Sequence, residues 1–400
     1  MSKFPPDWHQ VRIGNLLTEH SDRSTSNNQH EVLSVTKDGI FSQREYFKKQ
    51  IASEDNTGYK VVKRGDVVFS AMNLWMGSID VVKEYDCGIV SPAYITMRPR
   101  AELIDTDFLS YFLRGEVMRK KYVQHSQQGA SIVRRNLNKD DLLDDEVAIP
   151  PLPEQKMIAE ILSGIDSAIN AELVTASKVD MQYQGFLRQI FGGRSNILSL
   201  DHYSPLGELD LDISDGNYSS KYPSANEFVE RGVPFIRASN MKDGSIDDND
   251  MRFISAEKHR EITKGHLKAG DILIANRGDI GKTSRVPARH IGSNINAQVV
   301  RINGGGKLNQ SFLYHYLSSP FCQTLIDELT TGTALKQLPI GNIVKLLIPS
   351  PDLRTQIAIG DALDSMQKVI GISRKKVAKN SHLKRAVASD LLSGSKRVSV

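Results

Sequence analysis

Cysteine is nearly lacking in this sequence, since Cys87 and Cys322 are the only two among 400 residues. Neither has another cysteine or a histidine at the spacing of metal ligands, which argues against a disulfide framework and against a zinc site. We expect both to be buried thiols. Long apolar runs are lacking too: none approaches the ~18 residues of a membrane helix, and the N-terminus has no apolar signal-peptide core. We therefore expect a cytoplasmic protein.

Catalytic motifs are also scarce. Ser91–Tyr94 approximates the motif by which amino-methyltransferases hold a flipped base, but the second proline and a glycine-rich methyl-donor loop are missing. Gly281–Thr283 resembles the end of a phosphate-binding loop, yet Asn276 stands where the first glycine belongs. A strand edge and a turn are the simpler interpretations. The sequence favours a non-catalytic protein, and a scattered methyltransferase or nuclease site stays an alternative.

The charge is nearly balanced. Fifty-one Lys and Arg residues against 47 Asp and Glu give a net charge of +4, which neither indicates nor excludes a nucleic-acid partner. The hydrophobic content of 40% is that of a globular chain, and the length suggests two or three domains.

An internal repeat organises the chain. A Gly-Asp turn followed by an apolar strand occurs at Lys63–Phe69 and again, 205 residues later, at Lys268–Ile274. Two more segments repeat in the same order with offsets of 204 and 203 residues, Phe108–Leu113 with Phe312–Leu317 and Gly129–Ile132 with Gly332–Leu335. The slowly drifting offset indicates a duplicated module with small loop deletions.

A helical stretch of about forty residues follows each module, with a constant offset of 201 residues. Each stretch begins after a proline-rich boundary and ends near glycine. Apolar residues follow heptad spacing, at Ile158, Leu162, Ile165, Ile169, Ala176, Val179, Phe186 and Ile190 and at Ile359, Leu363, Met366, Ile370, Val377, Val387 and Leu391. We predict two long antiparallel helices that cover each other's seam; the alternative is that each helix packs on its own module.

The predicted fold is therefore α+β, with two similar modules, a spacer of two long antiparallel helices resembling a coiled coil, and a pseudo-two-fold internal repeat. The modules span residues 1–149 and 195–348, and the helical segments span 150–194 and 349–400. Each module combines short strands, many turns and a helix near 106–123 or 309–328.

The module loops hold side chains that suit phosphates and base edges. In the first module these are Arg23, Ser24, Asn27, Lys37, Arg44, Asn73, Gln127, Ser131, Arg134 and Arg135. In the second they are Lys221, Tyr222, Arg237, Asn240, Lys242, Asn276, Arg277, Lys282, Arg285, Thr331, Thr333 and Lys336. Any one of them can instead be a solvated surface residue. Residues 127–136, 330–337 and 276–281 stand out, because each segment places polar side chains around glycine.

This arrangement resembles the specificity subunit of type I restriction-modification enzymes. The likeness extends over essentially the whole chain and includes the Gly-Asp turns, the 276–281 loop and the prolines before Gln155 and Gln356. It implies two target recognition domains that each read half of a split DNA sequence, with the helices as spacer and docking surface. Residues Ala71–Trp75 depart from the glycine-bearing loop usual in the family, which leaves the roles of Asn73 and Trp75 open.

The same resemblance implies the partners. Two methyltransferase subunits would methylate adenine, and restriction subunits would supply ATP-driven translocation and cleavage. S-adenosylmethionine, ATP and Mg²⁺ would then bind to those subunits, with no cofactor on this chain. A recognition subunit of a type IIB-like methylation system has similar organisation, and an adaptor whose modules bind proteins is a further alternative.

Overall fold

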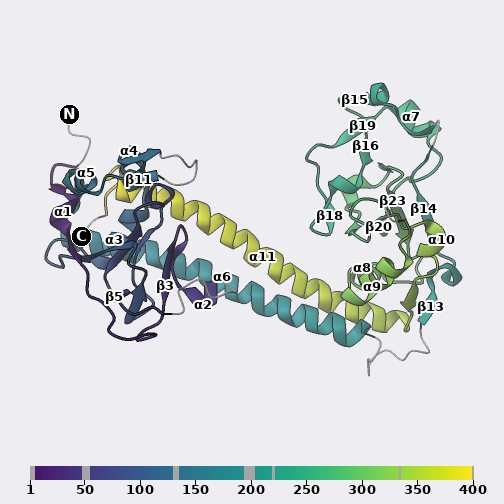
Figure 1. The fold of residues 1–400 in the computed structure, drawn as a ribbon. Coiled ribbons are helices and arrows are strands. Elements are labelled where there is room, and N and C mark those ends of the chain that lie inside the picture. Colours follow the sequence, from purple (N-terminus) through teal and green to yellow (C-terminus); the bar gives the residue numbers. More distant parts are fainter. Residues whose placement is uncertain are drawn as a thin grey trace. The chain divides into compact units, whose positions relative to one another are not determined.

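The computed structural model describes residues 5–46, 55–128, 135–192, 203–218, 221–332 and 335–398. The chain forms two compact units, and two helices of 40 residues each, α6 (Leu152–Phe191) and α11 (Leu353–Leu392), run through both of them (Figure 1). Unit one comprises Met1–Glu172 and Lys375–Val400, and unit two comprises Leu173–Arg374. Each unit thus contains one α+β module and one half of each long helix.

The module of unit one is built on an antiparallel four-stranded sheet in the order β2-β9-β6-β7, formed by Leu17–His20, Tyr94–Pro99, Val67–Ser70 and Ile79–Val81. Two-stranded sheets surround it: β1–β12 (His9–Arg12, Glu146–Ile149), β3–β4 (Leu33–Thr36, Gly39–Ser42), β5–β8 (Lys60–Lys63, Cys87–Val90) and β10–β11 (Ser126–Gln128, Arg135–Leu137). Its helices are α1 (Ile13–Leu16), α2 (Gln43–Tyr46), η1 (Leu74–Met76), α3 (Thr106–Arg114), α4 (Glu116–Gln124) and α5 (Lys139–Asp144).

The module of unit two repeats this topology. Its antiparallel sheet has the order β14-β23-β20-β21, formed by Asp212–Asp215, Val299–Asn303, Asp271–Ala275 and Thr283–Arg285, and β13 (Tyr203–Pro205) pairs with β24 (Leu347–Pro349) as β1 pairs with β12. The helices that follow are α8 (Gln310–Leu317), α9 (Pro320–Leu329) and α10 (Ile340–Ile343). The α+β class and the duplication predicted from sequence are confirmed.

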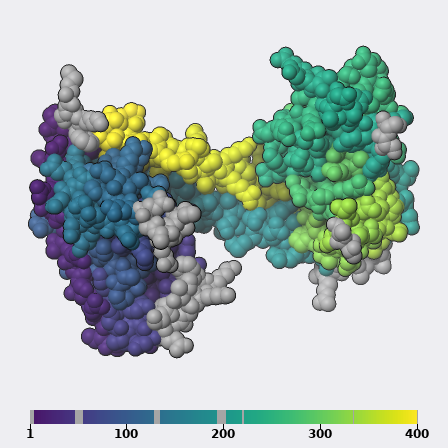
Figure 2. All heavy atoms as spheres, turned by 45° about the horizontal axis from the view of Figure 1, so that its top comes forward, coloured from purple at the N-terminus to yellow at the C-terminus, as the bar shows by residue number. Residues whose placement is uncertain are grey.

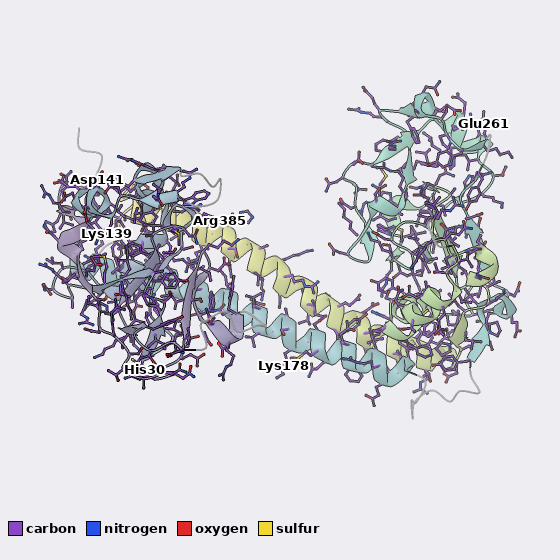
Figure 3. All side chains as sticks on the ribbon, in the orientation of Figure 1. His30, Lys139, Asp141, Lys178, Glu261 and Arg385 are labelled. Carbon is purple, nitrogen blue, oxygen red and sulfur yellow. The ribbon has the colours of Figure 1, made fainter. Side chains whose placement is uncertain are left out.

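Unit two also carries a second four-stranded sheet, β15-β19-β16-β22, formed by Phe228–Val229, Arg252–Ile254, Val233–Ile236 and Asn294–Ile295. The hairpin β17–β18 (Met241–Lys242, Ser245–Ile246), the short helices η3 (Leu206–Leu209), η5 (Ala225–Glu227), η6 (Ala238–Asn240) and η7 (Ala288–His290), and α7 (Ala256–Glu261) complete the module. Figure 3 marks Glu261 at the end of α7 in this outer part.

The repeated Gly-Asp turn has the same cause in both modules. Gly65 and Gly270 adopt φ of +93° and +83°, a backbone conformation that glycine tolerates without a Cβ penalty. The next residue is buried, and its carboxylate accepts a hydrogen bond from the backbone N–H three residues earlier, at 2.8 Å for Asp66 and 2.7 Å for Asp271. The turn thereby places the central strand of each sheet, β6 or β20.

A buried glutamine anchors the start of each long helix. In unit one, Oε1 of Gln155 accepts from the backbone N–H of Asp105 at 2.8 Å, and its Nε2 donates to the Pro150 carbonyl at 2.9 Å. Asp105 in turn caps α3 by accepting from the N–H of Phe108 at 2.9 Å. One side chain therefore ties the proline boundary, the long helix and the module's main helix together.

Gln356 makes the equivalent contacts in unit two. Its Oε1 accepts from the N–H of Asn309 at 2.8 Å, and its Nε2 donates to the Pro351 carbonyl at 2.8 Å. Asn309 caps α8 by accepting from the N–H of Phe312 at 3.0 Å. The glutamines are 1% and 2% exposed, so these polar contacts replace water entirely.

The two long helices are antiparallel, as predicted. Within unit one the ion pairs run in opposite order along the helices, from Asp166 with Lys384 at 2.6 Å to Glu172 with Lys376 at 2.7 Å. Their predicted seam residues are buried or half-buried, namely Ile158, Leu162, Ile165, Ile169, Ile359, Leu363, Met366 and Ile370. The alternative also holds in part, because Ile158 and Leu162 join the core of module one and Ile359 and Leu363 join that of module two.

Two expectations about burial are wrong. Phe186 was placed in the seam, but it is 42% exposed, while Tyr183 and Leu187 are buried at 5% and 2%. Tyr183 and Leu187 pack into the core of unit two, so the buried side of α6 here departs from strict heptad spacing. Cys322 is buried as expected, whereas Cys87 is only half-buried, because it begins β8 in a two-stranded sheet.

A three-way polar junction joins each module to both helices. In unit one the Tyr111 hydroxyl donates to Asp166 at 2.9 Å, and the Lys384 ammonium lies 5.2 Å from the centre of the Tyr111 ring. This junction holds an ion pair. The repeat assigns the equivalent positions in unit two to His315, Gln367 and Tyr183.

The junction of unit two has uncharged side chains at these three positions. Tyr183 lies 3.0 Å from Nδ1 of His315 and accepts from Nε2 of Gln367 at 3.0 Å. Nε2 of His315 lies 2.8 Å from Asp364, which also pairs with Arg285. His315 is fully buried, and this burial lowers its pKa to about 4 against the partial compensation of Asp364. The imidazole is therefore neutral at pH 7.

Replacing Gln356 by alanine is expected to destabilise the protein. The change leaves the Asn309 N–H and the Pro351 carbonyl buried without partners, which costs about 1–3 kcal/mol. The expected loss in Tm is several degrees, measured by differential scanning calorimetry. Gln182→Ala removes an exposed glutamine from α6 and serves as the control; equal effects of the two substitutions would show that the anchor is not important.

The lowered pKa of His315 predicts an acid-sensitive step in stability. Because the unfolded chain takes up the proton near pH 6.5 and the folded chain only near pH 4, stability is full above pH 6.5 and falls between these values. The fall is on the order of 3 kcal/mol. Denaturant unfolding measures the free energy of unfolding at each pH from 7 to 5. This free energy should fall less steeply for His315→Gln than for the wild type or for His9→Gln, which changes an exposed histidine. Parallel falls in all three proteins would contradict the lowered pKa of His315.

Candidate nucleic-acid interface

In unit two, three loops meet around Arg277. Its guanidinium lies 5.7 Å from the centre of the Tyr218 ring and donates to Oε1 of Gln337 at 3.1 Å. Gln337 and Thr331 exchange two backbone hydrogen bonds of 2.9 Å, and Lys336 beside them is exposed. We call this group the Arg277 surface. It joins the loop after β20, the segment after β14 and the predicted 330–337 loop, three stretches far apart in sequence.

Asn276 lies beneath this surface at the end of β20. Its backbone N–H donates to Gln298 at 3.0 Å, and its carbonyl accepts from the N–H of Leu338 at 2.9 Å. The side chain is 5% exposed, and its Oδ1 has no hydrogen-bond partner among the described residues. A buried acceptor without a partner carries a free-energy cost that a donor would relieve. Lys282, in the same loop, pairs with Asp279 at 3.1 Å.

Lys221 is linked to the same region. Its Nζ lies 3.5 Å from the hydroxyl of Thr263, and the amide of Asn217, next to Tyr218 in sequence, reaches that hydroxyl at 3.5 Å as well. Tyr222 packs edge-on against Phe235, with ring centres 5.7 Å apart, and is 38% exposed. Lys221 is therefore an exposed cation linked through Thr263 to the residue next to Tyr218, whereas Tyr222 contacts Phe235.

Three other predicted residues of module two form a separate group that is electrostatically less suited to DNA. Arg237 pairs with Asp250 at 2.8 Å, and Lys242 pairs with Asp247 at 2.6 Å, which raises the pKa of the Lys242 ammonium. Asn240 is 1% exposed, and its amide bonds the backbone of its own loop. Their charges are already neutralised in this conformation, and a buried amide reaches a base only if the loop rearranges.

Arg285 does not belong to a surface loop either. Its guanidinium lies 4.2 Å from the centre of the Tyr314 ring and pairs with Asp364 at the junction of unit two. The sequence could not distinguish it from the other arginines, because the carboxylate that neutralises it lies 79 residues away on α11.

Module one has a counterpart of the Arg277 surface. The Arg135 guanidinium lies 4.3 Å from the centre of the Trp75 ring, and the Arg135 backbone N–H donates to Met72 at 3.3 Å. Asn73 is half-buried at the start of η1, and Gln127 is exposed on β10. We call this group the Arg135 surface. It follows β6 as the Arg277 surface follows β20, so the unusual Ala71–Trp75 loop supplies the aromatic ring here.

The remaining predictions for module one are not brought together. Arg23 donates to the Gly58 carbonyl at 2.8 Å, while Ser24 and Asn27 bond the backbone of buried Asn56 and shape that loop. Lys37, in the β3–β4 turn, and Arg44, on α2, are exposed. Ser131, Arg134 and Thr333 lie outside the described residues.

The described residues hold no group of three or more His, Cys, Asp or Glu side chains that could bind a metal ion. Ser91–Tyr94 forms a turn that leads into β9, with the Tyr94 N–H donating to the Ser91 carbonyl at 3.0 Å. Burial raises the pKa of Cys322 to about 12, so this thiol stays protonated at neutral pH. No helix in the described ranges is long and apolar enough to cross a membrane.

Residues 5–175 and 212–379 each match the model of one protein family, described as the type I restriction modification DNA specificity domain. The two matches coincide with the two copies of the repeat and together include most of the chain. The chain belongs to the type I DNA specificity family. The match explains the duplicated module, because the family model describes one module with its helix and occurs twice here.

Two specificity subunits resemble this chain over nearly their whole length. The MjaVIII type I restriction enzyme specificity subunit of Methanocaldococcus jannaschii is 25% identical, covering 99% of this chain and 94% of the relative. The crystal structure of the type I restriction-modification S subunit from M. genitalium has a TM-score of 0.61 at 14% identity, covering 97% and 98% of the two chains. The S subunit structure supports the same fold for this chain.

Sequence analysis missed Tyr218 and Gln337. Gln337 ends the 330–337 segment, but the residues predicted there to contact DNA include its neighbour Lys336 and not Gln337 itself. Tyr218 has no repeated counterpart in module one, since the ring there comes from Trp75, so the repeat gave no signal for it.

Proposed function

We propose that this chain is the non-catalytic, sequence-specific DNA recognition subunit of a type I restriction-modification complex. The observation that carries the proposal is an arginine on an aromatic ring in each module, Arg135 on Trp75 and Arg277 on Tyr218. The loop after the central strand supplies the ring, Trp75, in module one and the guanidinium, Arg277, in module two. Arginine and amide side chains on such loops suit phosphates and base edges, and an aromatic ring holds the guanidinium in place. The family membership supports DNA as the partner.

The duplicated modules would each read one half of a split target, because repeated modules repeat their contact geometry. Two methyltransferase subunits would dock at the helices and adjoining module faces, and restriction subunits would complete the complex. S-adenosylmethionine, ATP and Mg²⁺ would bind to those subunits.

Exchanging residues 1–149 for another module of the family tests the proposal. We expect the exchange to alter one half of the methylated motif and to leave the other half unchanged, since each module contacts its own half-site. Sequencing that detects methylated adenine in cells with the methyltransferase subunits gives the motif. A continuous motif, or one in which both halves change, would contradict independent reading.

Removing the Arg277 guanidinium should weaken recognition of one half-site. A lost base or phosphate contact costs about 1–3 kcal/mol, so Arg277→Ala should bind the cognate duplex roughly 10- to 100-fold more weakly. Fluorescence anisotropy measures this for the assembled complex. Lys307→Ala, at an exposed lysine paired with Asp210, is the control; equal affinities for both variants and the wild type would remove Arg277 from the interface.

The long helices are proposed to set the spacing between the half-sites. Inserting four residues in α6 between Ala168 and Gln182, with four more at the equivalent place in α11, adds about 6 Å and just over one turn to each helix. The non-specific spacer in the motif should then lengthen by one or two base pairs of ~3.4 Å. Circular dichroism checks that the variant is folded. A folded, active variant with an unchanged spacer would contradict the proposal that the helices set the spacing between the half-sites.

A further inference from the structure

One stretch of α11 carries an excess of positive charge. Residues 365–389 contain seven Lys and Arg residues and no Asp or Glu. Without them the chain has 44 basic residues against 47 acidic ones, so the net charge of +4 arises from these 25 residues. A structural helix in balanced surroundings has no need of such an excess.

The internal repeat does not extend to the charge of the two long helices. The equivalent stretch of α6, residues 164–188, has three acidic residues, Asp166, Glu172 and Asp180, and two basic ones, Lys178 and Arg188. The two helices therefore keep equivalent apolar positions but differ in charge. Because the packing repeats and the charge does not, the charge serves something other than packing.

The cations of α11 in unit one divide into two sets. Lys376 and Lys384 pair with Glu172 and Asp166 of α6. The others, Lys375, Lys379 and Arg385, are exposed and share one face of the helix with the side chain of His382. We call these four residues the basic face.

The basic face is open to solvent. Its residues are spaced by three or four positions, so they lie on one side of the helix, away from half-buried Val377 and buried Leu391. Arg385 contacts His382, with Nη2 and Nδ1 3.0 Å apart. Figure 2 shows α11 uncovered in yellow, and Figure 3 marks Arg385 on it and, on α6, Lys178, the repeat counterpart of Lys379.

We propose that the basic face binds the phosphates of the DNA duplex without reading its sequence. The proposal rests on DNA recognition by the chain as proposed above. Lysine is depleted at the centres of protein–protein interfaces, whereas Lys and Arg supply most phosphate contacts. The stretch from Lys375 to Arg385 is about 15 Å long, which corresponds to roughly four base-pair rises.

Part of the positive charge on the recognition loops is already neutralised. In module two, Arg237, Lys242 and Lys282 are already paired with aspartates. The basic face also belongs to the same unit as the Arg135 surface. α11 ends at the α3–α4 corner, where Leu392 packs on Gly115, and α4 leads directly into β10. We expect a duplex bound on the Arg135 surface to reach the basic face as a second, sequence-independent contact within unit one.

The salt dependence of binding tests the proposal on the full chain with its methyltransferase subunits. The variant is Lys375→Gln/Lys379→Gln/Arg385→Gln, and the probe is a 40-base-pair duplex of random sequence. Loss of three phosphate contacts should reduce the slope of log K against log salt by about 2–3 and weaken binding roughly 10- to 100-fold. The control, Lys156→Gln/Lys178→Gln/Arg188→Gln, removes the same charge from exposed positions of α6.

Each outcome decides the question. A reduced slope in the α11 variant alone, with the methylated motif unchanged, supports the basic face. Equal slopes in both variants overturn it, as does intact DNA binding with loss of a partner subunit, which would assign the face to an acidic protein surface. If the wild-type complex binds no duplex, the proposed function itself fails.

Discussion

A buried glutamine at the start of each long helix ties three chain segments together, and the placement of each module on its helices depends on it. Gln155 and Gln356 satisfy the backbone of the proline boundary and of the residue that caps α3 or α8. Since unpaired groups there would be shut off from water, no other orientation of the module satisfies them equally well. The anchored helix α3 or α8 in turn packs on the sheet whose central strand leads into the recognition loop.

The two units preserve this frame while their chemistry differs. Where the module meets both helices, unit one has an ion pair between Asp166 and Lys384, and unit two has the neutral pair Gln367 and Tyr183. Tyr183, the repeat counterpart of Lys384, is buried beside Gln367, which is uncharged. A lysine at that position would be buried without the carboxylate that Asp166 supplies in unit one, which is costly. The two units thus share the geometry of the junction and differ in the charge of its side chains.

Much of this frame could be predicted from sequence because it repeats. The Gly-Asp turns, the proline boundaries and the long helices occur twice in order, and local chemistry determines each of them. The interface was harder to predict, because contacts between distant segments decide it. Arg237 is neutralised by Asp250, and Arg277 is held by Tyr218, a residue that no repeat marked. Phe186 shows the same limit, since the core of unit two selects Tyr183 and Leu187 instead.

If this chain determines which DNA sequence its complex modifies, methylation of that sequence must depend on the chain. Genome-wide mapping of methylated adenine, in cells with and without the chain, measures this dependence. A split motif should be methylated only when the chain is present, and methylation should return when the chain is supplied again. Unchanged methylation after removal of the chain would contradict this dependence.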